Sequence, residues 1–493
     1  MQLIWFRNDL RSFDHAGLTH ALATQEPVVA VFIATQVQWQ RHDMAEVKRD
    51  LIFTRVADLS KQLAKLNIPL LIEAVDTYTD SVGLITKLCQ KYGVKQVHMC
   101  VDYELNEQKR DEYCTRSLNP LGIKVASYHD SVIFPPGHVA KNDGALYKVF
   151  TPYKKQWLKQ FKQAIPGCYP KPKAQTASFS QAELNTQLEQ SQHEPQKIED
   201  KLNQLKIPFS YPGVSSVKSW QAEFVGSEEA ILNALRRFCK EVVEDYQRNR
   251  DFPLLDSTSK LSAYFAIGSL SPRQAINRLL AEQGDSLFEP DSGAGVWLSE
   301  LIWREFYRHH VADDPRISQG FAVKKEYQTL RWRNNKADFA AWCEGRTGFP
   351  IVDAAMRQLN QTGWMHNRLR MITASFLVKD LQIDWRWGEQ YFMRTLIDGD
   401  YAANNGGWQW SASTGHDAAP YFRIFNPTTQ GERFDKKGGF IRRFCPELGE
   451  VPDKNIHQPQ AYLKVFNANS SYPDAIVDHK SAREITLKMY KAE

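Results

Sequence analysis

The first 130 residues alternate short apolar runs with longer amphipathic segments, and this alternation limits the possible folds more than any other feature of the chain. The candidate strands are residues 3–6, 28–33, 70–74, 97–101 and 125–128. Helical periodicity fills intervals between them at residues 46–65, 81–91 and 106–118. Strands spaced by helices predict a parallel α/β sheet, and ligands of such sheets lie beyond the carboxyl ends of the strands.

The turn after the first candidate strand lacks the glycine pattern GxGxxG, so the sheet carries no dinucleotide fingerprint. The turn reads RNDLRSFDHAGL instead and brings Arg7, Asp9, Arg11 and Asp14 close together in the sequence. We expect these four side chains to form an ion-pair network with a structural role.

Composition changes twice along the chain and divides it into three parts. Pro-Pro-Gly at 135–137 ends the α/β pattern, and a stretch rich in Pro, Gln, Ser and Lys follows. From residue 217 helical periodicity dominates, with patterns at 228–248, 296–310, 350–359, 364–379 and 387–396. We predict an α/β domain at 1–135, a linker over the surface at 136–215 and a large all-helical domain at 216–493.

Charge, cysteine usage and hydropathy exclude several classes of protein. With 62 basic and 57 acidic residues the net charge is only +5, so the overall charge does not indicate a polyanionic partner. A local basic groove is still compatible with this small net charge. The seven cysteines are scattered without a CxxC pair, which indicates reduced thiols in a cytoplasmic protein and no metal site. No apolar run reaches about 18 residues, so we expect neither a signal peptide nor a membrane span.

The segment 398–410, DGDYAANNGGWQW, concentrates two carboxylates, two amides, two glycines and two indoles. Such polar groups are costly to bury without partners. Asn-Gly and Gly-Gly are turn signals, so the segment is either a surface turn whose acids cap a following helix or a ligand site. The segment alone does not choose between the two.

The segment 297–307, WLSELIWREFY, places Trp297, Glu300 and Arg304 on one helical face among aromatic residues. A solvated ion pair is the alternative interpretation, but the aromatic surroundings favour a site. Basic residues interleaved with aromatic ones are typical of nucleic-acid contacts, although a solvated face explains any one such run. These runs lie at 153–162, 248–252 and 421–423.

The segment 364–371, WMHNRLRM, places Trp364, Asn367 and Met371 on one helical face. With the neighbouring arginines this face suits a flat heterocycle better than a hydrophobic core. The run TSKLS at 258–262 offers hydroxyl and backbone N–H groups at a helix start, which is a ready anion site, although most such runs are only helix caps.

Long motifs follow one another along almost the whole chain. They are WFRNDLR, YKVFTPYKKQWL, RDFP, TSKLS, WLSELIWREFYRH, GFPIVDAAMRQLNQTGWMHNRLRM, DGDYAANNGGWQW and RIFNP. Together they resemble the photolyase/cryptochrome flavoproteins, and within that family the class I cyclobutane pyrimidine dimer DNA photolyases.

The resemblance implies FAD bound within the helical domain. The residues that match the family's flavin contacts are Tyr246, Thr258, Ser259, Lys260, Leu261, Ser262, Trp297, Glu300, Arg304, Asn367, Arg370, Asp398, Asp400 and Asn404. Lys260 stands where bacterial relatives carry arginine, which keeps the charge but loses a bidentate fork. We expect FAD binding to survive this difference.

The activity that the resemblance implies is light-driven electron transfer from reduced FAD to a dimer flipped out of DNA, which splits the cyclobutane ring into two pyrimidines. Glu300 matches the carboxyl group that donates a hydrogen bond to the dimer, so we expect it to be protonated in an apolar cavity. Asn404 matches the residue that faces flavin N5. The residues that match contacts to the dimer or to DNA are Arg250, Trp303, Asn367, Arg368, Met371, Trp410 and Arg423.

Two further sets of residues follow from the same resemblance. The family's tryptophan chain, which passes electrons from the surface to photoexcited flavin, is matched by Trp408, Trp385 and Trp332. An antenna site for methenyltetrahydrofolate is matched by His42, Asn106 and Glu107. Ser318 and Gln319 stand where the folate-binding form has a Cys-Lys pair, so a deazaflavin or an empty antenna site stays open.

A cryptochrome, which is a blue-light photoreceptor without repair activity, is the alternative within the family. Repair is favoured by Asn404, where cryptochromes commonly carry Asp or Cys, by Asn367, which replaces the second histidine expected in (6-4) photolyases, and by the lack of a long signalling tail. A flavin-dependent oxidoreductase would need a nicotinamide pocket, for which the sequence offers no candidate. We expect a cytoplasmic monomer that acts on UV-damaged DNA and does not contact membranes.

Overall fold

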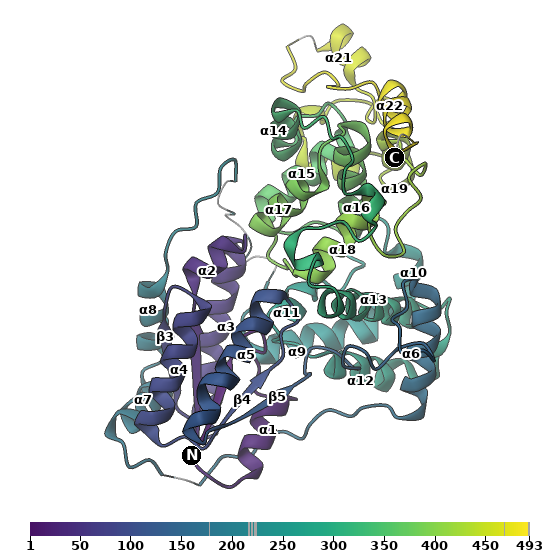
Figure 1. The fold of residues 1–493 in the computed structure, drawn as a ribbon. Helices are drawn as coiled ribbons and strands as arrows, with labels where there is room; N and C mark the ends of the chain where they lie inside the picture. Colours follow the sequence, from purple (N-terminus) through teal and green to yellow (C-terminus); the bar gives the residue numbers. More distant parts are fainter. Residues whose placement is uncertain (177, 215–216, 218–219, 221–223, 468, 492–493) are drawn as a thin grey trace.

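A five-stranded parallel sheet forms the N-terminal part of the molecule (Figure 1). The computed structural model describes all residues except 177, 215–216, 218–219, 221–223, 468 and 492–493. In the order β3-β2-β1-β4-β5, the strands are Leu70–Ala74, Val28–Ala34, Gln2–Phe6, Gln96–Cys100 and Lys124–Tyr128. The predicted parallel sheet is confirmed, and each predicted strand end lies within one residue of the observed one.

Helices cover both faces of the sheet, because the side chains of each strand alternate between two hydrophobic clusters. Ile4 and Phe6 of β1 join a cluster that continues into the helical part, whereas Leu3 and Trp5 join a smaller cluster on the other face. The helices of this part are α1 (Ala16–Ala23), α2 (Gln36–Arg41), α3 (Glu46–Ala64), α4 (Tyr78–Tyr92) and α5 (Leu105–Leu118). A 3-10 turn, η1 (Asn119–Leu121), leads into β5.

Three helices occupy the connection that follows the sheet: α6 (Phe150–Gln163), α7 (Ala182–His193) and α8 (Pro195–Leu205). The last two pack against α3. The Glu305 carboxylate accepts hydrogen bonds from Ile133 N (2.6 Å), Phe134 N (3.1 Å) and Trp157 Nε1 (2.7 Å), so one buried acid holds this connection against the helical part. The predicted domain limits stay predictions, and the limit at 215/216 lies outside the described residues.

The rest of the chain is largely helical, as predicted. Its α-helices are α9 (Glu228–Arg237), α10 (Tyr246–Asn249), α11 (Ser262–Ala266), α12 (Pro272–Gln283), α13 (Gly293–Asp313), α14 (Lys336–Glu344), α15 (Pro350–Thr362), α16 (Asn367–Ser375), α17 (Trp385–Thr395), α18 (Tyr401–Ser411), α19 (Pro427–Phe434), α20 (Gly439–Phe444), α21 (Gln460–Phe466) and α22 (His479–Lys491). Two π-helices, η3 (Phe238–Val242) and η8 (Phe376–Asp380), extend α9 and α16. The 3-10 helices are η4 (Val243–Asp245), η5 (Gly284–Phe288), η6 (Ile317–Gln319), η7 (Lys325–Tyr327) and η9 (Pro446–Leu448).

The charged residues after β1 take part in ion pairs, as expected, and the network includes partners outside the quartet. Arg7 pairs with Asp111, Arg11 with Asp130, Asp9 with His15 and Asp14 with Arg273. These partners come from other elements, so the quartet ties the sheet edge to α5, α1 and α12. Arg11 and Asp14 remain connected through Asp130 and Arg273. Sequence proximity alone could not show this, because Asp130 and Arg273 lie more than 100 positions away.

The cysteines and the hydropathy of the helices bear on two further predictions. All seven cysteines are unpaired thiols. Among the residues that the structure describes, no helix combines the length and apolarity needed to span a bilayer.

Candidate functional site

A cavity of about 500 Å³ opens between α11, α13, α16 and α18. Its lining contains every residue predicted to contact flavin except Leu261, whose side chain is buried in the core. Clefts of 300–1,000 Å³ with a few polar groups in an apolar wall are typical cofactor sites. The structure therefore brings residues from four separate motifs to one place.

Asp398 links two walls of this cavity. Its carboxylate accepts a hydrogen bond from Ser262 Oγ at 2.6 Å and pairs with Arg370 Nη2 at 2.8 and 3.0 Å. Arg370 also donates from Nε to the carbonyl of Met365 at 2.8 Å. Because the Asp398 side chain is only 2% exposed, these partners are needed to keep its charge in the interior.

Asp400 lies in the wall between this cavity and a second one. It caps α18 by accepting the Ala403 N–H at 3.1 Å, and it forms an ion pair with Arg308. Burial alone would raise the pKa of Asp400, but Arg308 and Arg304 hold it well below its usual range. From the sheet side, Lys48 of α3 donates to the Gly399 carbonyl at 2.6 Å.

The Asn-Asn-Gly-Gly run, predicted as a turn, lies within helix α18 instead. A Cβ at Gly406 would lie 2.2 Å from Tyr307 Cδ1, so this glycine lets α18 pack closely on α13. At Gly407, on the cavity side, a Cβ would meet no atom within 4 Å. Of the two alternatives, the surface turn is wrong, because the two glycines make room for a neighbouring helix and for the cavity.

Two polar groups of the wall fit a bound cofactor. Asn404 donates from Nδ2 to the Glu389 carbonyl at 3.0 Å, and none of the described residues donates to its Oδ1, which can accept from a ring N–H. Arg304 lines the cavity, and its buried Nε has no hydrogen-bond partner among the described residues. A buried group of this kind calls for a partner that the protein does not supply.

The three tryptophans of the predicted electron chain belong to one hydrophobic cluster, in which Trp408 and Trp385 are buried and Trp332 is partly exposed. Trp408 also lines the cavity and packs edge-on against Trp342 (6.0 Å between ring centroids) and Phe392 (5.0 Å). This arrangement is compatible with a path from the cavity toward the surface. The electron-transfer role stays a prediction.

Most residues predicted to contact DNA or the dimer line the same cavity: Arg250, Trp303, Asn367, Met371 and Trp410. Trp303 stacks on Phe150 of α6 with ring centroids 3.6 Å apart. Arg368 and Arg423 do not line the cavity. Arg423 is exposed on the segment between α18 and α19.

Glu300 differs from its expected environment. Its side chain is 34% exposed, and Oε1 lies 2.7 Å from Arg250 Nη1. The surroundings of Glu300 are therefore not purely apolar, which differs from the expectation, whereas its protonated state stays a prediction. The reason for this difference is that α10 ends beside α13, which sequence spacing does not reveal.

A second cavity of about 410 Å³ lies at the carboxyl edge of the sheet and is lined by His42, Asn106 and Glu107. The side-chain amides of Gln38 (2.9 Å) and Asn106 (3.1 Å) face Nε2 of His42, which makes this nitrogen the acceptor. His42 Nδ1 then carries the proton and faces Glu107 Oε1 at 3.4 Å. The predicted antenna residues thus form one connected group, and Ser318 also lines this cavity.

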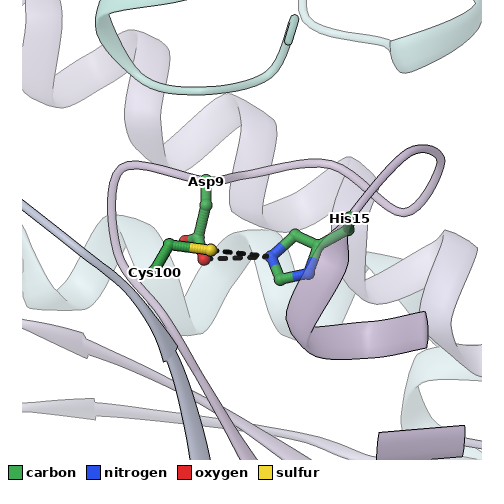
Figure 2. Close-up of side chains that lie close together, drawn as sticks. All are labelled: Asp9, His15 and Cys100. Carbon is green, nitrogen blue, oxygen red and sulfur yellow. Dashed lines mark hydrogen bonds and ion pairs between the residues drawn. The ribbon is translucent and has the colours of Figure 1, made fainter. Parts of the chain in front are cut away.

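A cluster of Asp9, His15 and Cys100 has the residue types of a metal site (Figure 2). His15 Nδ1 accepts the Leu18 N–H at 3.0 Å, so Nε2 carries the proton and donates to Asp9 Oδ2 at 2.9 Å. Neither ring nitrogen is left to bind a metal, and burial raises the pKa of the Cys100 thiol well above its usual range. The cluster fixes the start of α1 against the sheet edge.

Comparison with known proteins gives the class of the molecule. A family model described as "DNA photolyase" matches residues 2–172, and one described as "FAD binding domain of DNA photolyase" matches residues 297–492. These matches define an α/β domain of photolyase type joined to a photolyase FAD-binding domain.

Individual photolyases and a cryptochrome are similar to this chain over nearly its full length. A deoxyribodipyrimidine photo-lyase of Vibrio cholerae serotype O1 is 49% identical over 491 residues, which cover 100% of this chain and 99% of that protein. A class III photolyase of Agrobacterium tumefaciens has a similar structure, with a TM-score of 0.84, 31% identity and coverage of 100% and 97% of the two chains. A cryptochrome of Synechocystis sp. PCC6803 gives a TM-score of 0.83 at 27% identity, with 99% of each chain covered. The chain belongs to the DNA photolyase family.

Proposed function

We propose that this protein is a deoxyribodipyrimidine photo-lyase, which uses bound FAD and blue or near-UV light to split cyclobutane pyrimidine dimers in DNA. The observation that carries the proposal is the full-length 49% identity to a photo-lyase, together with one cavity that collects the predicted flavin residues. FAD, when bound, supplies the light-driven electron that opens the cyclobutane ring.

The chain's own residues would bind and orient this cofactor. Arg370, Asp398 and Ser262 form a rigid group at one wall, with a charge that is already compensated. Asn404 offers Oδ1 to a ring N–H, because its amide nitrogen is held by Glu389. Trp408, Trp385 and Trp332 would carry electrons toward the cavity from the surface.

The open side of the cavity would receive the dimer. Trp303 and Trp410 provide aromatic faces, and Asn367 and Met371 line the adjacent wall. A dimer is poorly stacked in a duplex, so flipping it into such a pocket is less costly than flipping a normal base. Arg250, Arg368 and Arg423 would hold the neighbouring phosphates.

The sheet-edge cavity would hold a second, light-harvesting chromophore, for which we propose methenyltetrahydrofolate. His42, Asn106 and Glu107 supply donors and acceptors suited to a pterin-like ring. Ser318 lines this cavity, whereas Gln319 does not, and neither supplies a cation. A deazaflavin is the alternative that this difference keeps open.

A cryptochrome-type photoreceptor is the second candidate function, and the similarity to the Synechocystis cryptochrome favours considering it. The fold alone does not separate the two functions, because both kinds of protein share it. Repair is favoured by Asn404 beside the flavin cavity and by a mouth that combines Trp303, Trp410 and Arg250.

A repair assay under controlled light tests the function directly. Purified protein with reduced flavin should restore UV-irradiated DNA under blue light and leave it unrepaired in the dark. Glu300→Ala should retain flavin and lower the number of dimers split per absorbed photon. Light-independent activity or no repair by flavin-loaded protein would rule out the proposal.

The cellular setting and the chain's organisation complete the proposal. The unpaired cysteines are compatible with the cytoplasm, and we propose a monomer. We also propose an antenna domain at 1–135, a connection at 136–215 and a catalytic domain at 216–493.

A further inference from the structure

Two ion pairs that start from neighbouring residues cross the edge of the helical cavity. Arg250, just after α10, places Nη1 2.7 Å from Oε1 of Glu300 on α13. The next residue, Asp251, holds Arg368 of α16 with contacts of 2.8 Å to Nη2 and 3.2 Å to Nε. We call Arg250, Asp251, Glu300 and Arg368 the rim clasp. It ties α13 and α16 together through one dipeptide.

The rim clasp is exposed enough to exchange partners. Its side chains are between 18% and 34% exposed, so solvent and ions reach each pair. Pairs in such positions contribute little to stability, and another anion can replace the carboxylate at small cost. A phosphate is a suitable substitute, because it can accept two parallel hydrogen bonds from a guanidinium, as Asp251 does from Arg368.

Aromatic rings hold the two arginines independently of the carboxylates. The Arg250 guanidinium lies 5.3 Å from the centroid of the Tyr246 ring, and that of Arg368 lies 4.6 Å from the centroid of the Phe434 ring. A cation over an aromatic face stays attracted when its ion pair is broken. The arginines are therefore positioned to keep their place while the anion changes.

We propose that the rim clasp is closed in the free protein and that DNA opens it, its phosphates taking Arg250 and Arg368 from Glu300 and Asp251. The inference rests on the proposed function, because it requires a polyanion at the cavity mouth. It assigns a role to Asp251, which competes with DNA and sets the affinity for it. It also gives the order of events at Glu300, whose carboxyl group faces the dimer only after Arg250 has moved to a phosphate.

Dark binding measurements on the flavin-loaded protein test the exchange. The probe is a fluorescent duplex that carries one thymine dimer, compared with the same duplex without it. Asp251→Asn should raise the affinity for both duplexes about two- to fivefold, because phosphate contacts are the same in both and no ion pair has to be broken. The gain should vanish when Arg368 is already changed to Gln, since Asp251 acts through Arg368.

A matched control separates exchange from simple charge removal. Asp256 lies on the same loop, pairs with Lys260 at 3.3 Å and is outside the rim clasp. Asp256→Asn removes the same charge and should raise affinity by less than half of the Asp251→Asn gain. An equal gain in this control, or a gain that persists in the Arg368→Gln background, overturns the proposal.

A second pair of variants keeps the test independent of any one substitution. Glu300→Gln should raise dark affinity in the same range, and the gain should vanish in the Arg250→Gln background. Flavin content and melting temperature of every variant show whether it is folded. If the unaltered protein repairs dimers in light but both gains are independent of the arginines, the rim clasp is wrong and the proposed function stands; if it neither binds nor repairs, the proposed function fails.

Discussion

The two cavities share paired acids but differ in which polar groups are left for a ligand. At the sheet edge, acids face arginines: Arg110 Nη2 lies 2.9 Å from Asp102, and Arg11 pairs with Asp130. Burial alone would raise the pKa of Asp130, but Arg11, His15 and Arg273 lower it to about 2. In the helical part, Glu389 stands behind the wall of the flavin cavity, and burial raises its pKa to about 7.

This difference concerns how many polar groups of each cavity have partners within the protein and how many are left for a ligand. In the wall of the sheet-edge cavity, Arg110 pairs with Asp102 and Arg11 pairs with Asp130. The helical cavity also pairs Asp398 with Arg370 and Asp400 with Arg308. It differs in that Asn404 Oδ1 accepts no hydrogen bond from the described residues, and in that the pKa of the nearby Glu389 is raised. We infer that the flavin is part of the helical fold, whereas the antenna chromophore is an addition to a finished site.

The largest effect is expected at Asp398, where the helical cavity carries its buried ion pair. Asp398→Ala leaves Arg370 without its carboxylate and Ser262 without its acceptor. Breaking such a pair costs about 3–5 kcal/mol, so the variant should lose most of its flavin and melt at a lower temperature. Flavin absorbance per protein and thermal melting measure both effects. If Asp398→Ala bound as much flavin as the unaltered protein, the Asp398–Arg370 pair would not be needed for the flavin site.

The next effect concerns Trp408, which lines the helical cavity. Trp408→Phe preserves an aromatic ring and should bind flavin normally, but illumination should no longer reduce the oxidised cofactor. Repair by protein that is reduced chemically beforehand should be spared. Transient absorption after a light pulse measures the first effect and dimer counting the second; loss of both would remove Trp408 from an electron-supply role.

A smaller effect is expected at the sheet edge. Glu107→Gln keeps the size of the side chain but removes the charge that faces His42 and accepts from Tyr78 Oη at 2.7 Å. The content of the second chromophore should fall severalfold while flavin content stays unchanged. Extraction followed by absorption and fluorescence spectra measures both and identifies the chromophore. Parallel loss of flavin would show that the two cavities are not independent.

Features set by local helical spacing could be predicted from the sequence, whereas features set by tertiary packing could not. Trp297, Glu300 and Arg304 share a face of α13 because helical spacing places them there, and this prediction is confirmed. The run at Gly406-Gly407 was misread because the reason for the first glycine, Tyr307, lies on another helix. The pairs Arg250–Glu300 and Asp251–Arg368 join residues 50 and 117 positions apart. Such pairs depend on tertiary packing, for which one sequence carries no local signal.

Residues that sequence patterns did not single out share this property. Arg308 and Lys48 fix the Gly399-Asp400 wall between the cavities, and they come from α13 and α3. Trp342, the neighbour of Trp408, comes from α14. Lys48 stands in the charged run EVKRD at 46–50, so the sequence gives no sign that its side chain is buried.

The smallest effect is a dependence of stability on pH that the helical part should show through Glu389. Its folded-state pKa of about 7 lies above the ordinary value, so the folded state holds a proton that the unfolded chain has released. Its contribution to stability is therefore fully present below about pH 4.3 and is lost as pH rises to about 7, by up to about 1.4 kcal/mol per pH unit. Glu389→Gln keeps an acceptor for Asn405 Nδ2 and does not titrate, so its melting temperature should rise relative to the unaltered protein between pH 5 and 8. A difference that stays constant over this range would show that Glu389 is held ionised, as Asp130 at the sheet edge is.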